Sequence, residues 1–384
     1  MLTFPSEFEQ LTFSMLKLSQ LFGAAPYPLE ISSQLMQNTI WRKIKEIVLR
    51  FSLQIWRSAL FFVLCWNVLE FVAHFDGWQL SFFSRFLYSV VHAIHVVVFA
   101  VIVFFSHRKV GTFYRNLVPK FERILDELKL YGMKVNLQKR MKVHCRIVTV
   151  SLILIVLFSS VDYFSRTSTW MWFMSFAVFL LPYWVTILYL LQYFYVMGIS
   201  CQIFKTIQRI IKDHSLTQLL DYPIQRHVRF NVEFLRKTTY SVTVLVQDTI
   251  DTFGFILLAE TLDVLVNMTV ALFEFHQFYN VDVTNIEDAL YLVCSVIWIC
   301  MQINLLMLIL LPQSAVNYEM KQIGIHLSLI AETELQTSVR RYSDLLLIKH
   351  NSYVAMGIIS LDMLHFAVIT NLITSNVLVL TQLG

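Results

Sequence analysis

Seven stretches of this chain are apolar over about the length that an α-helix needs to cross a membrane. A hydrocarbon layer ~30 Å thick takes about 20 apolar residues in helical form. The stretches "WMWFMSFAVFLLPYWVTILYLLQYFYVM" and "ALYLVCSVIWICMQINLLMLILL" contain no charged residue, and the whole chain is 57% hydrophobic and 15% charged. Soluble proteins have far more charge and less apolar content. We therefore expect an all-α, polytopic membrane protein with seven transmembrane helices, near residues 51–73, 82–105, 146–165, 170–197, 241–273, 289–311 and 353–382.

The basic residues gather on one side of these spans. Of the 30 Lys and Arg residues, 26 lie in four segments, which are 1–50, 106–145, 198–240 and 312–352. The connections on the other side contribute only Arg166. Lys and Arg remain on the cytoplasmic side of a membrane, so we expect a cytoplasmic N-terminus and, after seven spans, an extracellular C-terminus. A G-protein-coupled receptor would be threaded in the opposite direction, which excludes that class.

Two of the basic segments carry apolar residues at helical spacing. Residues three and four positions apart lie on one face of a helix, so the spans should continue as helices into a cytoplasmic anchor domain. The stripes should pack against another helix of the same protein or subunit; the alternative is that they lie on the membrane surface. No internal repeat is present, so residues 1–384 are interpreted as one domain. The stripe residues are Leu117, Phe121, Ile124, Leu125 and Leu128, followed by Ile203, Ile207, Ile210 and Ile211.

The fifth span is long and carries four acidic residues, Asp248, Asp251, Glu260 and Asp263. Carboxylates are costly in lipid, so these side chains should face protein or water. Two interpretations stay open: they line a cation path or hold a polar ligand, or they pair with His, Arg or Tyr on neighbouring helices. Only Glu260 and Asp263 lie in the outer half, where they suit an extracellular pocket.

The outer halves of the spans hold the residues that suit a small-ligand pocket, which combines apolar walls with a few placed polar groups. His92 and His95 share one helix face, but that helix has no carboxylate, so a hydrogen-bonded or pocket-facing role is expected and no metal or other cofactor is. Asn267 also begins a glycosylation sequon, which should stay unused within a span. The pocket candidates are Tyr88, His92, Asp162, Tyr163, Trp172, Phe176, Asp263, Asn267, Tyr291 and Trp298.

Several other classes lack their signatures. The five Cys residues show no CxxC spacing and mostly sit inside spans, so neither disulfides nor zinc are expected. An intramembrane enzyme would need a His cluster, a Ser-His pair or a paired-acid motif at matched depth, so no enzymatic activity is expected, and no nucleic-acid partner either. A secondary transporter is the main alternative from another class. It would carry inverted repeats with paired Gly/Pro-broken helices, which Pro182 and Pro312 do not provide.

The last predicted span reads "YVAMGIISLDMLHFAVITNLITSNVLVLTQL". Its frame of Ala355-x-Gly357, Leu361-Asp362 and a terminal unit of five mainly apolar residues before Gln resembles the signature of insect gustatory receptors, whose close is usually written TYhhhhhQF. The sequence "LFGAAPYPL" at 21–29 resembles the Gly-x-x-Pro opening of the same family. In the closing unit, Ser375-Asn376 stand at the Thr-Tyr pair, Val377 to Thr381 at the five h positions, Gln382 at the Gln and Leu383 at the Phe. Asn376, Thr381 and Leu383 depart from the pattern.

The resemblance implies a gustatory chemoreceptor that acts as a ligand-gated, nonselective cation channel of four subunits. In that architecture the last helix lines a central pore, a cytoplasmic helical domain holds the subunits together, and each subunit has a ligand pocket in its outer half. It also implies the plasma membrane of sensory neurons, with lipids, a small-molecule tastant and either identical or other gustatory receptor subunits as partners. The mainly aromatic outer halves favour a bitter or noxious compound over a sugar. An odorant-receptor-type subunit that needs a co-receptor is the nearest alternative.

The end of the chain is expected to lie at the outer mouth of that pore. Val379, Gln382 and Leu383 fall at i, i+3 and i+4, on one helix face. Four copies around an axis would form an apolar ring that blocks ions by dewetting, beside amide groups that replace water around a cation. The alternative is an ordinary packing face with Gln382 reaching the membrane interface.

Overall fold

The described part of the chain is helical throughout, apart from short turns. The computed structural model describes residues 12, 16–25, 40–73, 82–130, 132–133, 135–165, 168–220, 231–279, 286–329, 336–350 and 363–383. The helices are α2 (Ile40–Ala73), α3 (Phe82–Ala100), η3 (Val101–Phe105), α4 (Ser106–Leu130), α5 (Leu137–Ser165), α6 (Thr169–Ser175), η4 (Phe176–Leu180), α7 (Leu181–Leu220), α8 (Val232–Tyr279), α9 (Ile286–Ser328), α10 (Gln336–His350) and α11 (Met363–Leu383). The predicted all-α class is therefore confirmed.

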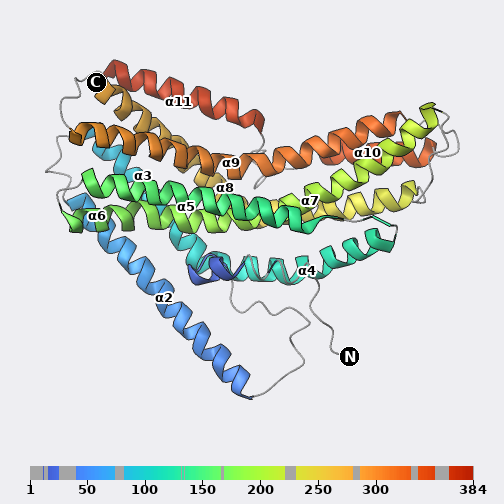
Figure 1. The fold of residues 1–384 in the computed structure, drawn as a ribbon, viewed down its shortest axis with the longest axis horizontal. Coiled ribbons are helices and arrows are strands. Elements are labelled where there is room, and N and C mark those ends of the chain that lie inside the picture. Colours follow the sequence, from blue (N-terminus) through green and yellow to red (C-terminus); the bar gives the residue numbers. More distant parts are fainter. Residues whose placement is uncertain are drawn as a thin grey trace.

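The longest helices run side by side along the long axis of the molecule (Figure 1). α7, α8 and α9 contain 40, 48 and 43 residues, which at a rise of 1.5 Å per residue makes each about 60 Å or longer, roughly twice the hydrocarbon thickness. The right-hand end of the view holds the C-terminal ends of α4, α7 and α9 and the N-terminal end of α8, all of which lie in the basic segments of the sequence. The helices therefore extend from the membrane on the basic, cytoplasmic side, while the C-terminus lies at the opposite end.

Five described helices are long and apolar enough to cross a membrane, and a sixth span results if the bent pair Ser89–Phe104 and Lys109–Leu130 counts as one. α11 provides a shorter apolar helix, His365–Val379. The predicted seventh span begins at residue 353, whereas α11 begins at Met363 and residues 351–362 lie outside the described part.

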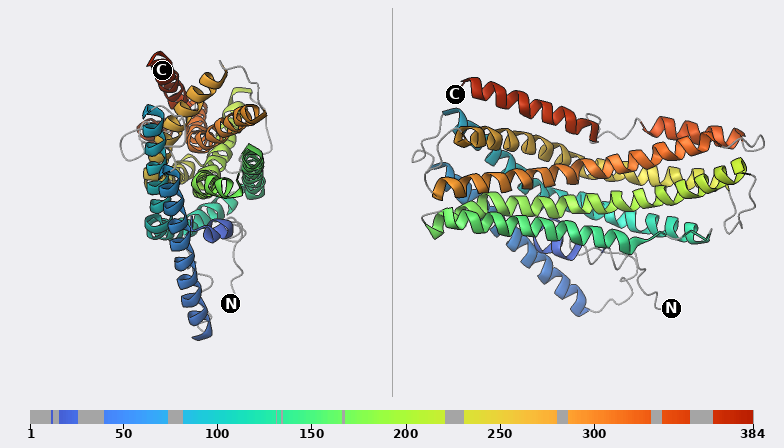
Figure 2. Two further views of the ribbon diagram at one scale, coloured as in Figure 1. Left: turned by 90° about the vertical axis from the view of Figure 1, so that its left-hand side faces the viewer. Right: turned by 45° about the horizontal axis from the view of Figure 1, so that its top comes forward.

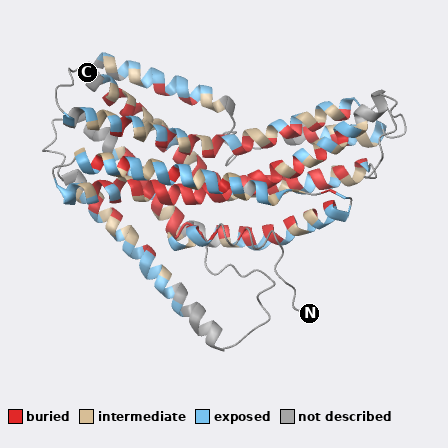
Figure 3. Ribbon diagram, in the orientation of Figure 1, coloured by how far each residue is buried: buried red, intermediate tan, exposed pale blue. Residues whose placement is uncertain are grey.

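α7 occupies the centre of the bundle. Every residue from Pro182 to Tyr193 is buried, because α3, α5, α8 and α9 all contact α7 (Figure 3). A helix that is apolar on all sides suits such a position. α2 is apolar for another reason: large side chains such as Phe51 and Leu69 are exposed on it, as they are on a helix that faces lipid. The same apolar pattern thus arises from protein contact in one helix and from lipid contact in another.

The two cytoplasmic stripes are buried inside the chain. Leu117, Phe121 and Leu128 of α4 and Ile203 and Ile207 of α7 are each no more than 2% exposed. α4 packs against α8, and α7 packs against α8 and α9. The prediction that the stripes pack against helices of the same protein is confirmed for this part of the chain, and the membrane-surface alternative is wrong for it.

α10 joins this cytoplasmic bundle by lying against α8 and α9 (Figure 2). Its Tyr342 is fully buried and shares a hydrogen bond with the hydroxyl of Thr239 on α8. Burial raises the pKa of Tyr342 far above the usual range of a phenol, so the side chain stays neutral. A neutral hydroxyl pair can be buried at little cost once each partner is hydrogen-bonded.

Two π-helical turns interrupt the regular helices. η3 separates α3 from α4, and the helix axis of Ser89–Phe104 differs by 54° from that of Lys109–Leu130. η4 ends two residues before Pro182 at the start of α7. A proline lacks the amide hydrogen and clashes with the carbonyl four residues earlier, and a π-helical turn relieves such a site. Each turn also rotates the residues that follow it around the helix axis.

The N-terminal segment 16–25 is inserted between α2 and α7 by polar contacts. Gln192 Nε2 donates to the Ala24 carbonyl at 2.7 Å, and Arg57 donates to the Ala25 carbonyl at 3.3 Å. Gly23, whose φ is 76°, makes the turn that leads from the helical residues 16–21 to Ala24 and Ala25. A Cβ at this position would lie 3.0 Å from Arg57 Cγ. The glycine of the Gly-x-x-Pro opening is therefore required by a left-handed turn packed against Arg57.

We expect Gly23→Ala to destabilise the protein by about 1–2 kcal/mol, because the left-handed backbone is strained for alanine. Thermal unfolding of the detergent-solubilised chain measures this. Gly324→Ala is the matched control: it lies inside α9, and its new Cβ would meet only Leu346 Cδ1 at 4.0 Å. That change should be neutral or stabilise by up to about 1 kcal/mol. Equal effects of the two substitutions would contradict the explanation.

Candidate functional site

A polar cluster is buried where α3, α7 and α8 meet. His95 Nε2 lies 2.9 Å from Asp263 Oδ2, and Asn267 Nδ2 donates to the same oxygen at 2.9 Å. One turn earlier on α8, Glu260 Oε1 accepts a hydrogen bond of 3.1 Å from Thr186 of α7. All five side chains are buried. Glu260 follows the cytoplasmic start of α8 by about 40 Å of helix, so the cluster lies in the outer half of the bundle.

The two oxygens of the Asp263 carboxylate have different surroundings. Oδ2 accepts hydrogen bonds from both His95 and Asn267, whereas no donor from the described residues reaches Oδ1. The Oε1 of Gln302, on α9, is buried and also without a donor among those residues. Leaving such groups buried without a partner costs free energy, so the bare oxygens mark a place where something else supplies a donor.

Asp263 and Gln302 both line a small cavity. Its walls come from α3, α7, α8 and α9, and its volume is about 10 Å³, which is room for about one water molecule. Tyr183 and Trp298 supply aromatic walls, and Pro182 and Leu305 complete the apolar part. The cavity thus combines aromatic surface with polar groups from His95, Thr186, Glu260, Asp263 and Gln302.

Four of the ten predicted pocket residues gather at this site. Asp263 and Trp298 line the cavity. Asn267 Nδ2, the nitrogen that a glycan would modify, donates a hydrogen bond to Asp263 and so lies inside the bundle. His92 is buried one turn before His95, with their ring centroids 6.3 Å apart, and its ring lies 5.2 Å from that of Phe179. Whether these residues bind a ligand remains a prediction.

The other predicted residues lie elsewhere. Tyr163 and Trp172 make an edge-on ring contact at 5.6 Å, and Trp172 packs on Phe176 at 6.0 Å, which joins α5 to α6 and η4. Asp162 is buried on α5. Tyr291 donates to Glu274 Oε2 at 2.8 Å near the outer ends of α9 and α8. The side chain of Tyr88 lies outside the described part.

Sequence reasoning missed Tyr183, Thr186 and Gln302. Tyr183 and Thr186 are three positions apart, and Trp298 and Gln302 are four apart, so each pair shares a helix face. These spacings were available in the sequence. Their meeting with Asp263 was not, because it depends on the rotation of three separate helices.

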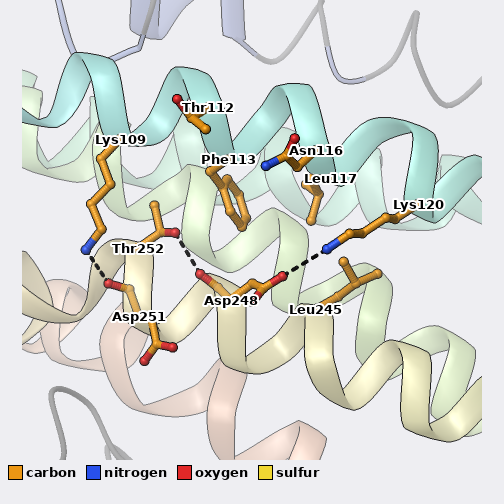
Figure 4. A pocket seen from close by; sticks show the side chains of 10 residues that line it. All are labelled: Lys109, Thr112, Phe113, Asn116, Leu117, Lys120, Leu245, Asp248, Asp251 and Thr252. Carbon is orange, nitrogen blue, oxygen red and sulfur yellow. Dashed lines mark hydrogen bonds and ion pairs between the residues drawn. The ribbon is translucent and has the colours of Figure 1, made fainter.

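The inner acids of α8 border a larger cleft of about 520 Å³ against α4, shown in Figure 4. Lys120 Nζ lies 3.2 Å from Asp248 Oδ2, and Lys109 Nζ donates to the Asp251 carbonyl. Gln247 donates to Asp251 Oδ1 at 2.8 Å. Both carboxylates thus have partners within the chain, which agrees with the structural interpretation of the inner pair.

α11 packs mainly on α8 and also on α9. The packed side is formed by Ile369 and Ile373, which are buried, and by Phe366 and Val377, which are half-buried. The opposite side consists of exposed residues and includes Asn371, Ser375 and Gln382, at i, i+4 and i+11. Of the predicted pore residues, Val379 and Gln382 are exposed, and the side chain of Leu383 lies outside the described part.

These features together define a polytopic helical membrane protein with a helical cytoplasmic extension and a buried polar cavity in its outer half. The chain belongs to the 7tm chemosensory receptor family, whose model matches residues 12–384. The recognition of the insect chemoreceptor superfamily from the sequence is thereby confirmed.

The fold resembles that of the insect olfactory receptor OR5 from Machilis hrabei. The structure in complex with eugenol aligns with a TM-score of 0.58 at 9% identity, and another structure of OR5 aligns with 0.56 at 9%. Each alignment covers 99% of this chain and 100% of the other. At this identity the likeness shows the fold alone. No curated protein sequence matches the chain.

We expect His95→Leu to destabilise the protein by about 3 kcal/mol, because it leaves the Asp263 carboxylate buried without its imidazole partner. The double variant His95→Leu/Asp263→Leu should recover most of the loss, since a well-packed apolar pair replaces a buried charged one at little cost. Thermal unfolding in detergent compares the two. A double variant as unstable as the single would show that packing around His95, and not its pairing, sets the cost.

Proposed function

We propose that the protein is a gustatory receptor that opens as a ligand-gated, nonselective cation channel of four subunits in the plasma membrane of sensory neurons. The gustatory assignment rests on the C-terminal residues from Ala355 to Leu383. The odorant-type alternative, in which the chain needs a co-receptor subunit, draws support from the fold shared with an olfactory receptor. In both cases the receptor binds a small molecule in its outer half and passes ions along a separate path.

The observation that carries the proposal is the orientation of α11. Its packed side is apolar, while Asn371, Ser375 and Gln382 point away from the bundle. Hydrocarbon offers no hydrogen bonds, so these three polar side chains, which share the exposed side with Leu378 and Val379, need water or another protein surface. Four copies around a central axis provide both, because these side chains then face a water-filled path.

α8 connects the outer cavity to the proposed pore helix. It carries Glu260 and Asp263 at the cavity, and it forms most of the surface on which α11 packs. A ligand that binds the open state more tightly than the closed state shifts the equilibrium between them. Movement of α8 on binding would reach α11 directly, without an intermediate element.

The ligand class follows from the composition of the cavity. Aromatic walls with a few polar groups suit a small organic molecule, and a sugar would need many aligned hydroxyl partners. The olfactory receptor of similar fold is described in complex with eugenol, itself a small organic compound. We therefore favour a bitter or noxious compound as the tastant.

Gln382→Ala should change ion selectivity or block, because Gln382 is the only predicted pore residue with a carbonyl side chain to offer a cation. Leu383→Ala should widen the apolar ring and raise the current in the absence of ligand. Whole-cell recordings at matched surface expression measure both. The control is Thr370→Val, since the Thr370 hydroxyl already donates to the Phe366 carbonyl of its own helix. Normal behaviour of both pore variants would place the pore elsewhere.

The full-length chain, solubilised in mild detergent, should migrate with the mass of four chains when its size is measured by chromatography with light scattering. The exposed polar side of α11 is the reason, because it has no partner within the described part of a single chain. A lone monomer, both alone and after co-expression with related subunits, would contradict the assembly.

A further inference from the structure

We propose that the outer cavity recognises a primary ammonium group, so that the tastant is a small organic amine in its protonated form. The inference deepens the proposed function, on which it rests for the role of the site. It rests on four features of the cavity: the polar atoms that lack a hydrogen-bond partner, the charged groups, the volume and the aromatic walls.

The bare polar atoms of the cavity accept hydrogen bonds. Asp263 Oδ1 is buried and lacks a donor among the described residues, and a carboxylate that is ionised can only accept. Gln302 presents its carbonyl oxygen, also buried and without a donor in that part of the chain. A ligand that completes this set must donate hydrogen bonds.

The charge of the cluster points in the same direction. Two carboxyl groups, on Glu260 and Asp263, face a single imidazole, that of His95. Among the described residues, no Lys or Arg lines the cavity. At the inner end of the same helix the arrangement is different, because Lys120 lies 3.2 Å from Asp248. The outer cluster therefore has two carboxyl groups to one imidazole and no lysine, whereas the inner one is paired with Lys120.

The size of the cavity selects the form of the cation. A volume of about 10 Å³ holds one group of the size of a water molecule. An –NH₃⁺ group has that size and carries three donors, whereas a trimethylammonium group is larger and has none. The cavity has no room for the remainder of such a molecule, so Trp298 and Tyr183, which line it, would have to move apart to seat an organic group between them. Aromatic faces attract ammonium ions, which adds to the hydrogen bonds.

The aromatic walls are held by other rings. Trp298 contacts Phe158 at 5.5 Å, Phe179 at 5.6 Å and Tyr183 at 6.3 Å, measured between ring centroids. Tyr183 OH donates to the Met301 carbonyl at 3.1 Å. These contacts join α5, η4, α7 and α9 around the cavity. A ligand seated there would bear on four elements as well as on α8.

The test measures binding to the purified full-length receptor by the rise in its melting temperature. Three probes share one skeleton: 2-phenylethylammonium, 2-phenylethanol and N,N,N-trimethyl-2-phenylethylammonium. The primary ammonium should act at about a tenfold lower concentration than either of the others, as expected for one charge-assisted hydrogen bond or more. Equal potency of the alcohol, greater potency of the trimethyl compound, or no effect of the primary ammonium would each overturn the inference.

Asp263→Asn should remove the preference for the primary ammonium over the alcohol, because it removes the charge and keeps the size of the side chain. Asp248→Asn, the same change on the same helix, should leave the preference intact. If Asp263→Asn does not yield folded protein, Gln302→Leu serves instead and should weaken the ammonium effect severalfold without changing that of the alcohol. An unchanged preference in Asp263→Asn, or in Gln302→Leu where that variant is used, would overturn the inference.

The binding measurement does not depend on channel opening, so the two proposals fail separately. A receptor that prefers the primary ammonium and passes no current with any probe would keep this inference and overturn the proposed channel. A receptor that opens to other tastants and binds the three probes alike would do the reverse.

Discussion

The structure depends on the fact that hydrocarbon offers no hydrogen-bond partners. Backbone groups are satisfied inside helices, and most hydroxyl side chains of α8 follow the same rule: Thr243, Thr249 and Thr261 each donate to the carbonyl four residues earlier. Carboxylates cannot be satisfied in this way, because they only accept hydrogen bonds and need donors from side chains or water. The two buried acids of α8, Glu260 and Asp263, therefore require side chains that donate to them at their depth.

The four acids meet this requirement in two different ways. At the inner end, side chains of α4 and of α8 itself supply donors to Asp248 and Asp251, and the result is a fixed contact between two helices. At the outer end, His95 supplies a donor to only one oxygen of Asp263. The first arrangement is complete within the chain and adds a half-exposed ion pair to the apolar contacts between α4 and α8. The second is incomplete, and it lies on the helix that also supports α11. The structural interpretation thus agrees with the contacts of the inner pair, while the functional interpretation of the outer pair stays a prediction.

Sequence alone predicts those features that follow from one helix at a time. The stripe of Leu117 and Phe121 needs only a period of 3.6 residues, and the orientation needs only the count of basic residues. The cavity needs the rotation of four helices relative to one another. Trp172 and Trp298 are equivalent candidates by depth and composition, yet only Trp298 lines the cavity. η4 lies between Trp172 and Tyr183, and a π-helical turn shifts the residues after it by about 100°. The spacing of 3.6 residues per turn therefore does not predict which face the residues after such a turn occupy.

α11 shows the same limit in another form. Val379 and Gln382, which its sequence places on one helix face, are both exposed, but the partner of that face is not contained in the described part of one chain. Ile369 and Ile373 give it a narrow contact with the bundle, much smaller than the one that surrounds α7. A helix with so little burial gains most of its stabilisation from whatever covers its other side. If that cover is the polar face of three further copies around a water-filled axis, then assembly and pore formation are one event. The same residues would then determine both the stability of the complex and the passage of ions.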